Sequence, residues 1–151
     1  MQPGFDYIGV NVVFICHDDE GNILMHLRSE ACRDEHNTWD YGGGKVEFGE
    51  TLEEAARREI REEYGCEVRH LTYLNTDTIF REHEGRKSHW VVSVFVAHVD
   101  PREIRIGSPE DMIELGWYQP SRLPEPLHSG AARWFRDCRS EIDAAITKHI
   151  E

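Results

Sequence analysis

The sequence predicts a single α/β domain over residues 1–151, in which a mixed β-sheet lies between helices. Three observations support this fold class: several runs rich in β-branched and aromatic residues, one capped helix near the middle, and an amphipathic helical pattern at the C-terminal end. With 151 residues, of which 39% are apolar, the chain is long enough to bury one core and too short to build two.

The first strands lie before the middle helix. Residues 7–15, YIGVNVVFI, form an apolar run, and residues 23–27, ILMHL, form a second one. The segment DDEGN between them carries Gly21 and Asn22, residues that are typical of tight turns. We therefore predict a β-hairpin here, followed by a polar loop that leads to Trp39.

The second half of the chain predicts three more strands and a helix. Residues 68–80 and 89–99 are rich in β-branched and aromatic side chains, and a charged loop, REHEGRKS, is expected between them over residues 81–88. Residues 112–119 predict another strand. The apolar side chains of residues 129–150 recur at helical spacing and predict one continuous amphipathic helix.

The middle helix has clear signals at both ends. Thr51 and Glu54 form a capping-box pair at its start, and Gly65 is placed to end it. Projection at 100° per residue predicts a face that packs on the sheet and a solvated face. The first consists of Leu52, Ala55, Ala56 and Ile60, and the second of Glu53, Glu54, Arg57, Arg61 and Tyr64.

Three further glutamates of this helix do not belong to its solvated face. Glu59 and Glu63 project onto the apolar strip, and Glu62 lies at its edge. Burying unpaired carboxylates is costly, so a cation is expected beside them. Either arginines such as Arg58 neutralise the carboxylates, or a hard divalent cation does so. Three carboxylates suit Mg²⁺ or Mn²⁺ better than Zn²⁺.

Composition excludes several classes of function. The net charge of -12 argues against binding a nucleic acid polymer or an anionic membrane. No run approaches the ~20 apolar residues that span a bilayer, and no secretory signal is visible, so we expect a cytoplasmic protein. The four cysteines form no Cys-x-x-Cys pair, which argues against structural zinc and against a disulfide framework.

The complete spacing of this region resembles the Nudix box. Gly44 is followed after five residues by Glu50, and after seven more by the run REIREEYGC from Arg58 to Cys66. All the fixed positions of the box match. Cys66 stands where a bulky aliphatic residue is usual, and Gly42 stands where relatives often have proline. The predicted order of strands and helices over nearly the whole chain is also that of the Nudix fold.

This resemblance implies an enzyme that hydrolyses a nucleoside diphosphate linked to another group, X, with the help of Mg²⁺ or Mn²⁺. It implies that Glu59, Glu62 and Glu63 are metal ligands, that Glu62 or Glu63 also acts as the base, and that the Gly43 carbonyl is a further ligand. Arg58 would orient the carboxylates. Further roles in the resemblance fall to Glu47 and Glu50, which would support the loop, and to a late loop acid, Asp111, with Glu110 and Glu114 as rivals.

Substrate contacts are less well defined. Arg28, Arg33, Lys45 and Arg81 are candidate phosphate contacts, together with Arg86 and Lys87, although a base in such a position is more often an ordinary solvated surface residue. Trp39 and Phe80 are candidates for stacking on a base or for core packing. The default substrate is a nucleoside triphosphate or a modified nucleotide, as for MutT-like relatives, and the resemblance also allows a homodimer.

Alternatives remain open at this point. Arg28, Ser29 and Arg33 match part of a coenzyme A pyrophosphatase signature, whereas Asn37, Tyr41 and Gly42 depart from it. A nucleotide-sugar or ADP-ribose pyrophosphatase is a further alternative, although the markers after the box are absent. Two readings belong to other classes: a non-catalytic nucleotide sensor of the same fold, and a Mg²⁺-dependent diphosphate isomerase.

Overall fold

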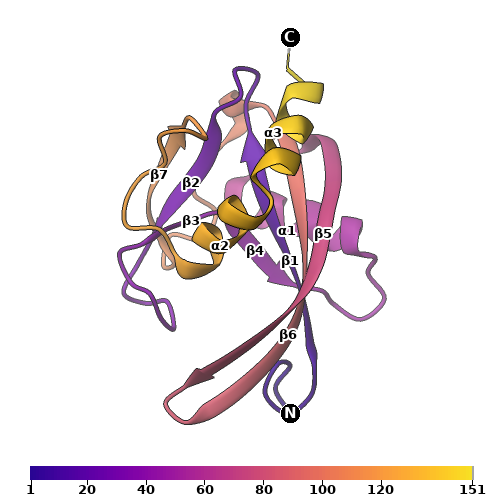
Figure 1. The fold of residues 1–151 in the computed structure, drawn as a ribbon, viewed down its shortest axis with the longest axis vertical. Coiled ribbons are helices and arrows are strands. Elements are labelled where there is room, and N and C mark those ends of the chain that lie inside the picture. The colour runs from indigo at the N-terminus through magenta and orange to yellow at the C-terminus, as the bar shows by residue number, and fades with distance from the viewer. Residues whose placement is uncertain (151) are drawn as a thin grey trace.

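A computed structural model describes residues 1–150 and confirms the predicted fold class (Figure 1). The strands are β1 (Gly9–His17), β2 (Ile23–Arg28), β3 (Trp39–Asp40), β4 (Gly42–Lys45), β5 (Val68–His83), β6 (Arg86–Val99) and β7 (Met112–Tyr118). The helices are α1 (Leu52–Tyr64), α2 (Ser129–Asp137) and α3 (Arg139–Lys148), with a short 3₁₀ turn at Pro101–Glu103. None of the helices described is long and apolar enough to cross a membrane.

The seven strands form one mixed sheet in the order β3-β2-β1-β6-β5, with β4 added to β1 and β7 added to β2. Strand β1 pairs with β6 in parallel along its whole length, from Gly9 opposite Trp90 to His17 opposite His98. The other pairs are antiparallel. The predicted hairpin between β1 and β2 is paired at only one register position, His17 opposite Ile23. Beyond that position β2 pairs with β3 and β7.

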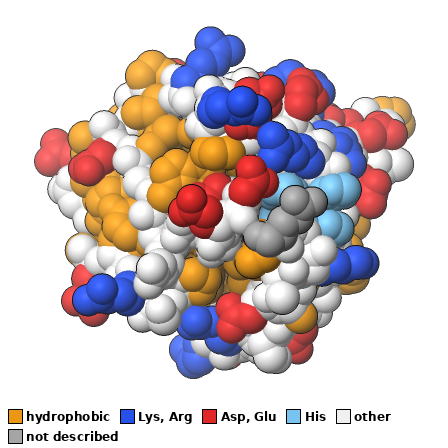
Figure 2. Space-filling model, turned by 90° about the horizontal axis from the view of Figure 1, so that it is seen from above, with side chains coloured by type: hydrophobic (Ala, Val, Ile, Leu, Met, Phe, Trp, Pro, Cys, Tyr) orange, Lys and Arg blue, Asp and Glu red, His pale blue; other side chains and the backbone are white. Residues whose placement is uncertain are grey.

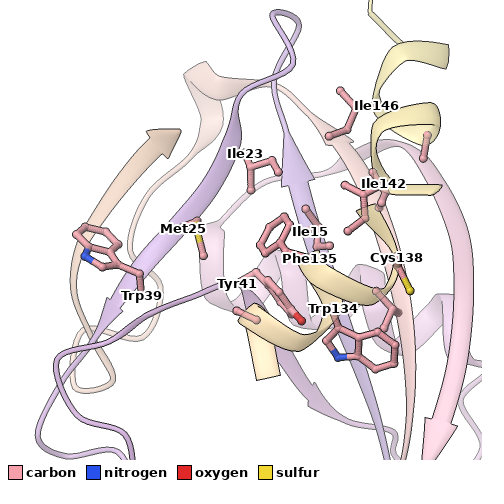
Figure 3. Packing of buried hydrophobic residues seen from close by; sticks show 14 of the residues in the cluster. Ile15, Ile23, Met25, Trp39, Tyr41, Trp134, Phe135, Cys138, Ile142 and Ile146 are labelled. Atoms are coloured by element: carbon pink, nitrogen blue, oxygen red, sulfur yellow. The ribbon is translucent and has the colours of Figure 1, made fainter. Parts of the chain in front are cut away.

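Each face of the sheet carries its own core. On one face, side chains of β1 and β2 pack against α2 and α3, and Figure 3 shows Phe135 and Ile142 of these helices beside Ile15. On the other face, Ala55, Ala56 and Ile60 of α1 are completely buried with strand residues such as Phe14 and Phe95. The sheet is therefore the middle layer between α1 and the two C-terminal helices.

Helix α1 begins and ends as predicted, whereas its buried strip differs from the prediction. The Thr51 hydroxyl accepts the backbone N–H of Glu54, and Gly65 ends the helix with φ at 69°. Leu52, predicted to pack on the sheet, is 36% exposed, and Tyr64, predicted to face solvent, is 1% exposed. Leu52, Ala56, Ile60 and Tyr64 are all spaced by four residues, but each such step turns by about 40° around the helix axis. Tyr64 is therefore turned by about 120° from Leu52, and the buried part of the row is its C-terminal part, while Leu52 is the first residue of the helix.

The predicted charged loop 81–88 is wrong. Strands β5 and β6 continue through it, with His83 opposite Arg86, and only Glu84 and Gly85 form the turn. Both turn residues have positive φ, 51° and 79°, which is the requirement of the tight turns that join twisted antiparallel strands. The hairpin therefore extends far from the rest of the sheet, beside the N-terminal segment (Figure 1), where the His89 N–H donates to the Gly4 carbonyl.

The single helix predicted over residues 129–150 is also wrong. Cys138, with φ at -121° and ψ at 25°, separates α2 from α3. The apolar positions keep their spacing through the break, so their pattern carries no signal of it. Trp134 of α2 and Ile146 of α3 both reach the same core, and the bend lets the two helices follow one twisted sheet.

The N-terminal cap of α1 should contribute measurably to stability. Replacing Thr51 with Ala removes the acceptor of the Glu54 N–H, and we expect the free energy of unfolding to fall by about 1 kcal/mol. Urea denaturation followed by circular dichroism measures this loss. Thr51→Ser keeps the hydroxyl and is the matched control. A Thr51→Ala protein as stable as the Thr51→Ser protein would contradict the capping role.

Candidate active site

A cleft of about 1250 Å³ opens beside the strand β4 and the glutamate-bearing face of α1. Its walls also include residues from β1, β2, β5, β6 and the start of α2. Most of the predicted site residues line this cleft: Arg28, Arg33, Gly43, Lys45, Arg58, Glu59, Glu62, Glu63, Phe80, Arg81 and Asp111. Glu50, Arg86 and Lys87 are not among its lining residues, and neither is Trp39, which is buried and packs edge-on against Tyr118 with ring centroids 5.3 Å apart.

Arg58 is the centre of an ion-pair network between α1, the loop before it and the end of β4. Its Nε donates to Glu50 Oε2 at 2.6 Å, and its Nη1 lies 2.8 Å from Glu59 Oε1 and 3.2 Å from Glu62 Oε2. A further N–H donates to the Lys45 carbonyl at 2.9 Å. The guanidinium thus joins α1, the loop before it and the end of β4, and the Glu50 carboxylate raises the pKa of Arg58 above its usual value.

The glycines of β4 leave room for two of the carboxylates. A Cβ atom on Gly42 would overlap the Glu63 carboxylate, and one on Gly44 would overlap the Glu59 carboxylate. Because glycine has no Cβ, the backbone of β4 comes into direct contact with both acids. The box therefore requires glycine at these positions for space, whatever their backbone angles.

Glu63 is the most unusual titratable group of the cleft. Its Oε2 is buried and has no hydrogen-bond partner among residues 1–150. Burial raises the pKa of Glu63 well above its ordinary value, and the neighbouring carboxylates of Glu59, Asp40 and Asp111 raise it further. The pKa of Glu59 is also raised by burial, although Arg58 opposes this. Either a proton or a cation would compensate the Glu63 carboxylate.

The donor set fits a hard divalent cation, although its ligand atoms are not fully gathered. Oxygen donors from Glu59, Glu62 and Glu63 face the cleft, and Glu62 is 57% exposed at its edge. In the described part of the chain, the carboxylate oxygens of these three residues do not all lie within 4.8 Å of one another. Arg58 binds Glu59 and Glu62, so in this structure it provides part of the positive charge.

One other group of potential ligands does meet that distance, namely Asp34, Glu35 and His128 on the opposite wall. Its atoms already have partners. His128 Nδ1 accepts the N–H of Gly130, so the ring proton is on Nε2, which donates to Glu35 at 2.8 Å. Glu35 also accepts two hydrogen bonds from Ser129, and these hydrogen bonds lower its pKa against the effect of burial. This group is therefore a hydrogen-bonded anchor between the 29–38 loop and α2.

The candidate substrate contacts differ in their exposure and in whether a carboxylate of the protein already pairs with them. Arg28 is largely buried and paired with Asp34 and Asp40, and Arg81 is paired with Glu35 at 3.4 Å. Arg33 is 51% exposed and stands over the Phe5 ring at 5.5 Å. Phe80 is 72% exposed and contacts the His89 ring. Phe80 is available to a ligand at once, and Arg33 has only a long contact of 3.9 Å with Asp34, whereas Arg28 and Arg81 first have to give up an internal carboxylate.

Sequence reasoning missed several groups that line the cleft. Asp40 is largely buried beside Arg28, and burial raises its pKa. His26 contacts the Tyr64 hydroxyl through its Nδ1 at 2.8 Å. Both residues lie in short strands and carry no local signal of a site. Only the pairing of β2 with β3, which places His26 opposite Asp40, shows that the two residues are neighbours. Of the three late acids, Asp111 lines the cleft, and Glu110 and Glu114 are not among its lining residues.

Replacing Gly44 with Ala should displace the Glu59 carboxylate, because the new methyl group would occupy its place. We expect weaker binding of Mn²⁺, measured by electron paramagnetic resonance, in a protein that still folds. Lys45→Ala changes the next, exposed residue and is the matched control. Equal Mn²⁺ affinity of the Gly44→Ala and Lys45→Ala proteins would show that the close approach of β4 to Glu59 is unimportant.

The burial of His26 should make stability depend on pH. Burial first, and then the charges of Arg28 and His128, lower the pKa of His26 from 6.5 to about 4. Between these values the unfolded chain binds the proton more strongly, so stability is complete above pH 6.5 and declines as the pH falls towards 4. The pKa of His17 is also lowered to about 4, and it adds a loss of the same sign.

Urea denaturation at a series of pH values tests this expectation. His26→Gln should show a smaller loss of stability on acidification than the unchanged protein, because one of the two buried imidazoles is gone. His83→Gln, at an exposed position, should behave like the unchanged protein. An acid response that is identical in all three proteins would rule out His26 as a source.

Comparison with known proteins places the chain among described relatives. Residues 8–138 match the family model described as NUDIX domain. The chain is 33% identical over 122 residues to the mouse 8-oxo-dGDP phosphatase NUDT18, covering 80% of this chain and 34% of the relative. It is 33% identical over 143 residues to the NAD-capped RNA hydrolase NudC of Escherichia coli O157:H7, covering 87% of this chain and 49% of that protein. The chain thus spans half or less of the length of these relatives.

Solved structures agree with the fold. A MutT NUDIX hydrolase from Burkholderia pseudomallei is 30% identical, with a TM-score of 0.75, and the match covers 87% of this chain and 98% of that one. A MutT protein from Bacillus halodurans is 25% identical, with a TM-score of 0.68, covering 85% and 80% of the two chains. The family match extends from before β1 to the end of α2 and includes every residue that lines the glutamate side of the cleft. On these grounds the chain belongs to the Nudix family.

Proposed function

We propose that this protein is a Mg²⁺- or Mn²⁺-dependent pyrophosphohydrolase that cleaves the diphosphate linkage of a nucleoside diphosphate joined to a group X. One observation carries this proposal: a buried Glu63 oxygen that has no hydrogen-bond partner among residues 1–150 lies next to Glu59 on the wall of a large cleft. A chain with a net charge of -12 needs such a cation before it can accept an anionic substrate.

The metal would be held by Glu59, Glu62 and Glu63, with the Gly43 carbonyl as a further ligand. When bound, it would neutralise charge on the diphosphate and lower the pKa of a bound water. Arg58 acts as a positioning residue, because it holds the Glu59 and Glu62 carboxylates from a network anchored on Glu50 and on the Lys45 carbonyl. Asp111, Glu62 and Glu63 are the candidates for the base that takes the proton from water.

The opposite wall suits the rest of the substrate. Lys45 is exposed near the glutamates, and Arg33 and Phe80 are exposed farther along the cleft, so that a phosphate and a planar group can each find a partner. Arg28 and Arg81 would bind phosphate after leaving Asp34 and Glu35. Trp39 is not proposed as a stacking residue, because it is buried against Tyr118 outside the cleft lining.

We propose a nucleoside triphosphate or a modified nucleotide as the substrate. The mouse relative, whose name includes 8-oxo-dGDP phosphatase, and the MutT-like structures support this class. The acidity of the chain argues for a small nucleotide over a nucleic acid polymer. Nucleotides of this class and four free cysteines are in keeping with a cytoplasmic location. Sedimentation of the purified chain would test for the homodimer that the resemblance allows.

A substrate panel tests the proposal directly. Nucleoside triphosphates, oxidised nucleotides, nucleotide sugars, ADP-ribose, NAD, dinucleoside polyphosphates and coenzyme A are each incubated with the protein and Mg²⁺, and the products are identified. We expect cleavage at a diphosphate linkage that stops when the metal is chelated. Tight binding of one compound with no turnover of any would favour the nucleotide sensor, and a rearranged diphosphate would favour the isomerase.

Glu63→Gln is the sharpest variant for this activity. The amide keeps the size of the side chain but removes the negative charge, so we expect kcat to fall by several orders of magnitude while the fold survives. Circular dichroism checks the fold. Glu53→Gln, on the solvated side of the same helix, is the matched control and should keep its activity. Near-normal turnover by the Glu63→Gln protein at saturating Mg²⁺ would overturn the assignment.

A further inference from the structure

Four of the nine histidines lie in a row at the end of the sheet where the C-terminal helix finishes. The ring centroids of His17 and His98 are 4.9 Å apart, those of His98 and His70 are 5.7 Å apart, and those of His70 and His149 are 4.2 Å apart. Figure 2 shows histidine side chains gathered at one place on this face of the molecule. None of the four is among the residues that line the cleft.

The backbone enforces this arrangement. His17 ends β1 directly opposite His98 in the parallel pairing with β6, and His98 is opposite His70 in the antiparallel pairing with β5. Residues at matching positions of neighbouring strands point to the same face of a sheet, so three imidazoles are adjacent by register. His149 is the residue that ends α3 and brings a fourth ring onto the row.

Two of these rings have a buried nitrogen with nothing to bind. His17 Nδ1 donates to the Asp18 carbonyl at 2.9 Å, which leaves the Nε2 lone pair free, and that atom is buried without a partner among residues 1–150. His98 Nε2 lies 2.6 Å from Asp19 Oδ1, and its buried Nδ1 likewise has no partner within the described chain. A ring that donates one N–H to a carbonyl or carboxylate and keeps its other nitrogen bare is the usual state of a histidine ligand to a metal.

We propose that His70, His98 and His149 form a binding site for a borderline divalent transition metal, of which Zn²⁺ is the test case, and that Asp19 positions His98 within it. In the structure the ring nitrogens of the three residues do not all lie within 4.8 Å of one another, so the rings must move to share one ion. With a Zn–N distance of about 2.1 Å, ligating ring centroids lie about 3.2 Å from the metal, and tetrahedral geometry sets them about 5.2 Å from one another. The three centroid distances are 4.2, 5.7 and 6.4 Å.

The rings stand nearly parallel, within 8–12° of one another, so ligation requires some of them to turn. His70 is exposed and His149 is half-buried, and both have room to rotate about the Cβ–Cγ bond, where the torsion is soft. His98 stays in place because Asp19 holds it and His17 stacks on its far side. The movement is thus confined to the two outer rings.

The charges around the row are mixed, with two carboxylates and three basic side chains. Asp19 and Asp100 lie beside the row, and both are paired with Arg69. Arg102, on Asp100, and Lys148, on the last turn of α3, are the other bases nearby. His149 is at the C-terminal end of α3, where the helix dipole attracts positive charge. Burial lowers the pKa of His17 to about 4, so this ring stays neutral and does not repel an ion.

The site differs in chemistry from the glutamate cleft. Imidazole nitrogens suit Zn²⁺, Ni²⁺ and Cu²⁺, whereas Mg²⁺ and Mn²⁺ prefer the carboxylate oxygens of the cleft. The proposal therefore does not depend on the hydrolase function. Bound metal would fasten α3 to β5 and β6 through His149, His70 and His98, and would stabilise the folded chain in proportion to its occupancy.

The test is a titration of the purified chain with Zn²⁺ in the presence of excess Mg²⁺, which keeps the cleft glutamates occupied. We expect one Zn²⁺ per chain, a rise in Tm, and shifts of the imidazole nitrogen signals of His98 and His149 in NMR spectra. The double variant His70→Gln with His149→Gln should bind Zn²⁺ at least ~10-fold more weakly, and Asp19→Asn about 10-fold to 100-fold more weakly. The matched control replaces His36 and His83, two exposed histidines outside the row.

Equal Zn²⁺ affinity of the His70/His149 variant and the His36/His83 control would overturn the proposal. So would Zn²⁺ binding that is lost in the Glu63→Gln protein and retained in the His70/His149 variant, since the metal would then be in the cleft. Nucleotide hydrolysis should be unchanged by the His70/His149 substitutions, so failure of this site and failure of the proposed hydrolase function give different results.

Discussion

The guanidinium of Arg58 is the interaction around which the candidate site is organised. It reaches Glu50 in the loop before α1, Glu59 and Glu62 on the helix itself, and the Lys45 carbonyl at the end of β4. Charge-assisted hydrogen bonds to several carboxylates are among the stronger polar contacts in proteins, and they are directional. One side chain therefore sets the position of α1 relative to β4, and with it the distance between the glutamates and the glycine strand.

The same network leaves one acid unsatisfied. Arg58 compensates Glu59 and Glu62, whereas Glu63 is deeper, against Gly42 and Phe14, and its Oε2 has no partner among the described residues. A buried carboxylate in this position lowers the stability of the fold, and packing alone gives no reason to keep it. The cost becomes intelligible if the cleft accepts a cation, which is also what a strongly acidic chain needs to bind a phosphate compound.

Much of this was visible in the sequence, because the signals are local. Thr51, Gly65 and the spacing of the glutamates are properties of one helix, and helical periodicity places Glu59 and Glu63 on its apolar side without any knowledge of the sheet. Features that depend on pairing were not visible. The break at Cys138 leaves the apolar period intact, and the continuation of β5 and β6 through residues 81–88 depends on a turn whose charged flanks resemble a loop.

The residues of the cleft wall also depend on contacts between distant parts of the chain, which the sequence does not reveal. His26 and Asp40 meet because β2 pairs with β3, and Glu35 reaches Ser129 across 94 positions of the chain. Tyr64 is buried because its hydroxyl has His26 as a partner, which no property of α1 alone reveals. Trp39 looked as suitable for stacking as Phe80, and only the contact with Tyr118 separates the two. Local chemistry identified the acids, and topology determines what surrounds them.

The break at Cys138 divides the C-terminal segment into two parts with different neighbours. Helix α2 begins at Ser129 against Glu35 and so contributes to the cleft, whereas α3 ends at His149 on the row of histidines. Because the two helices are separate elements, a change in α3 does not have to be transmitted rigidly to the start of α2. Substitutions at the end of α3 can therefore alter the row of histidines while the start of α2 keeps its contact with Glu35.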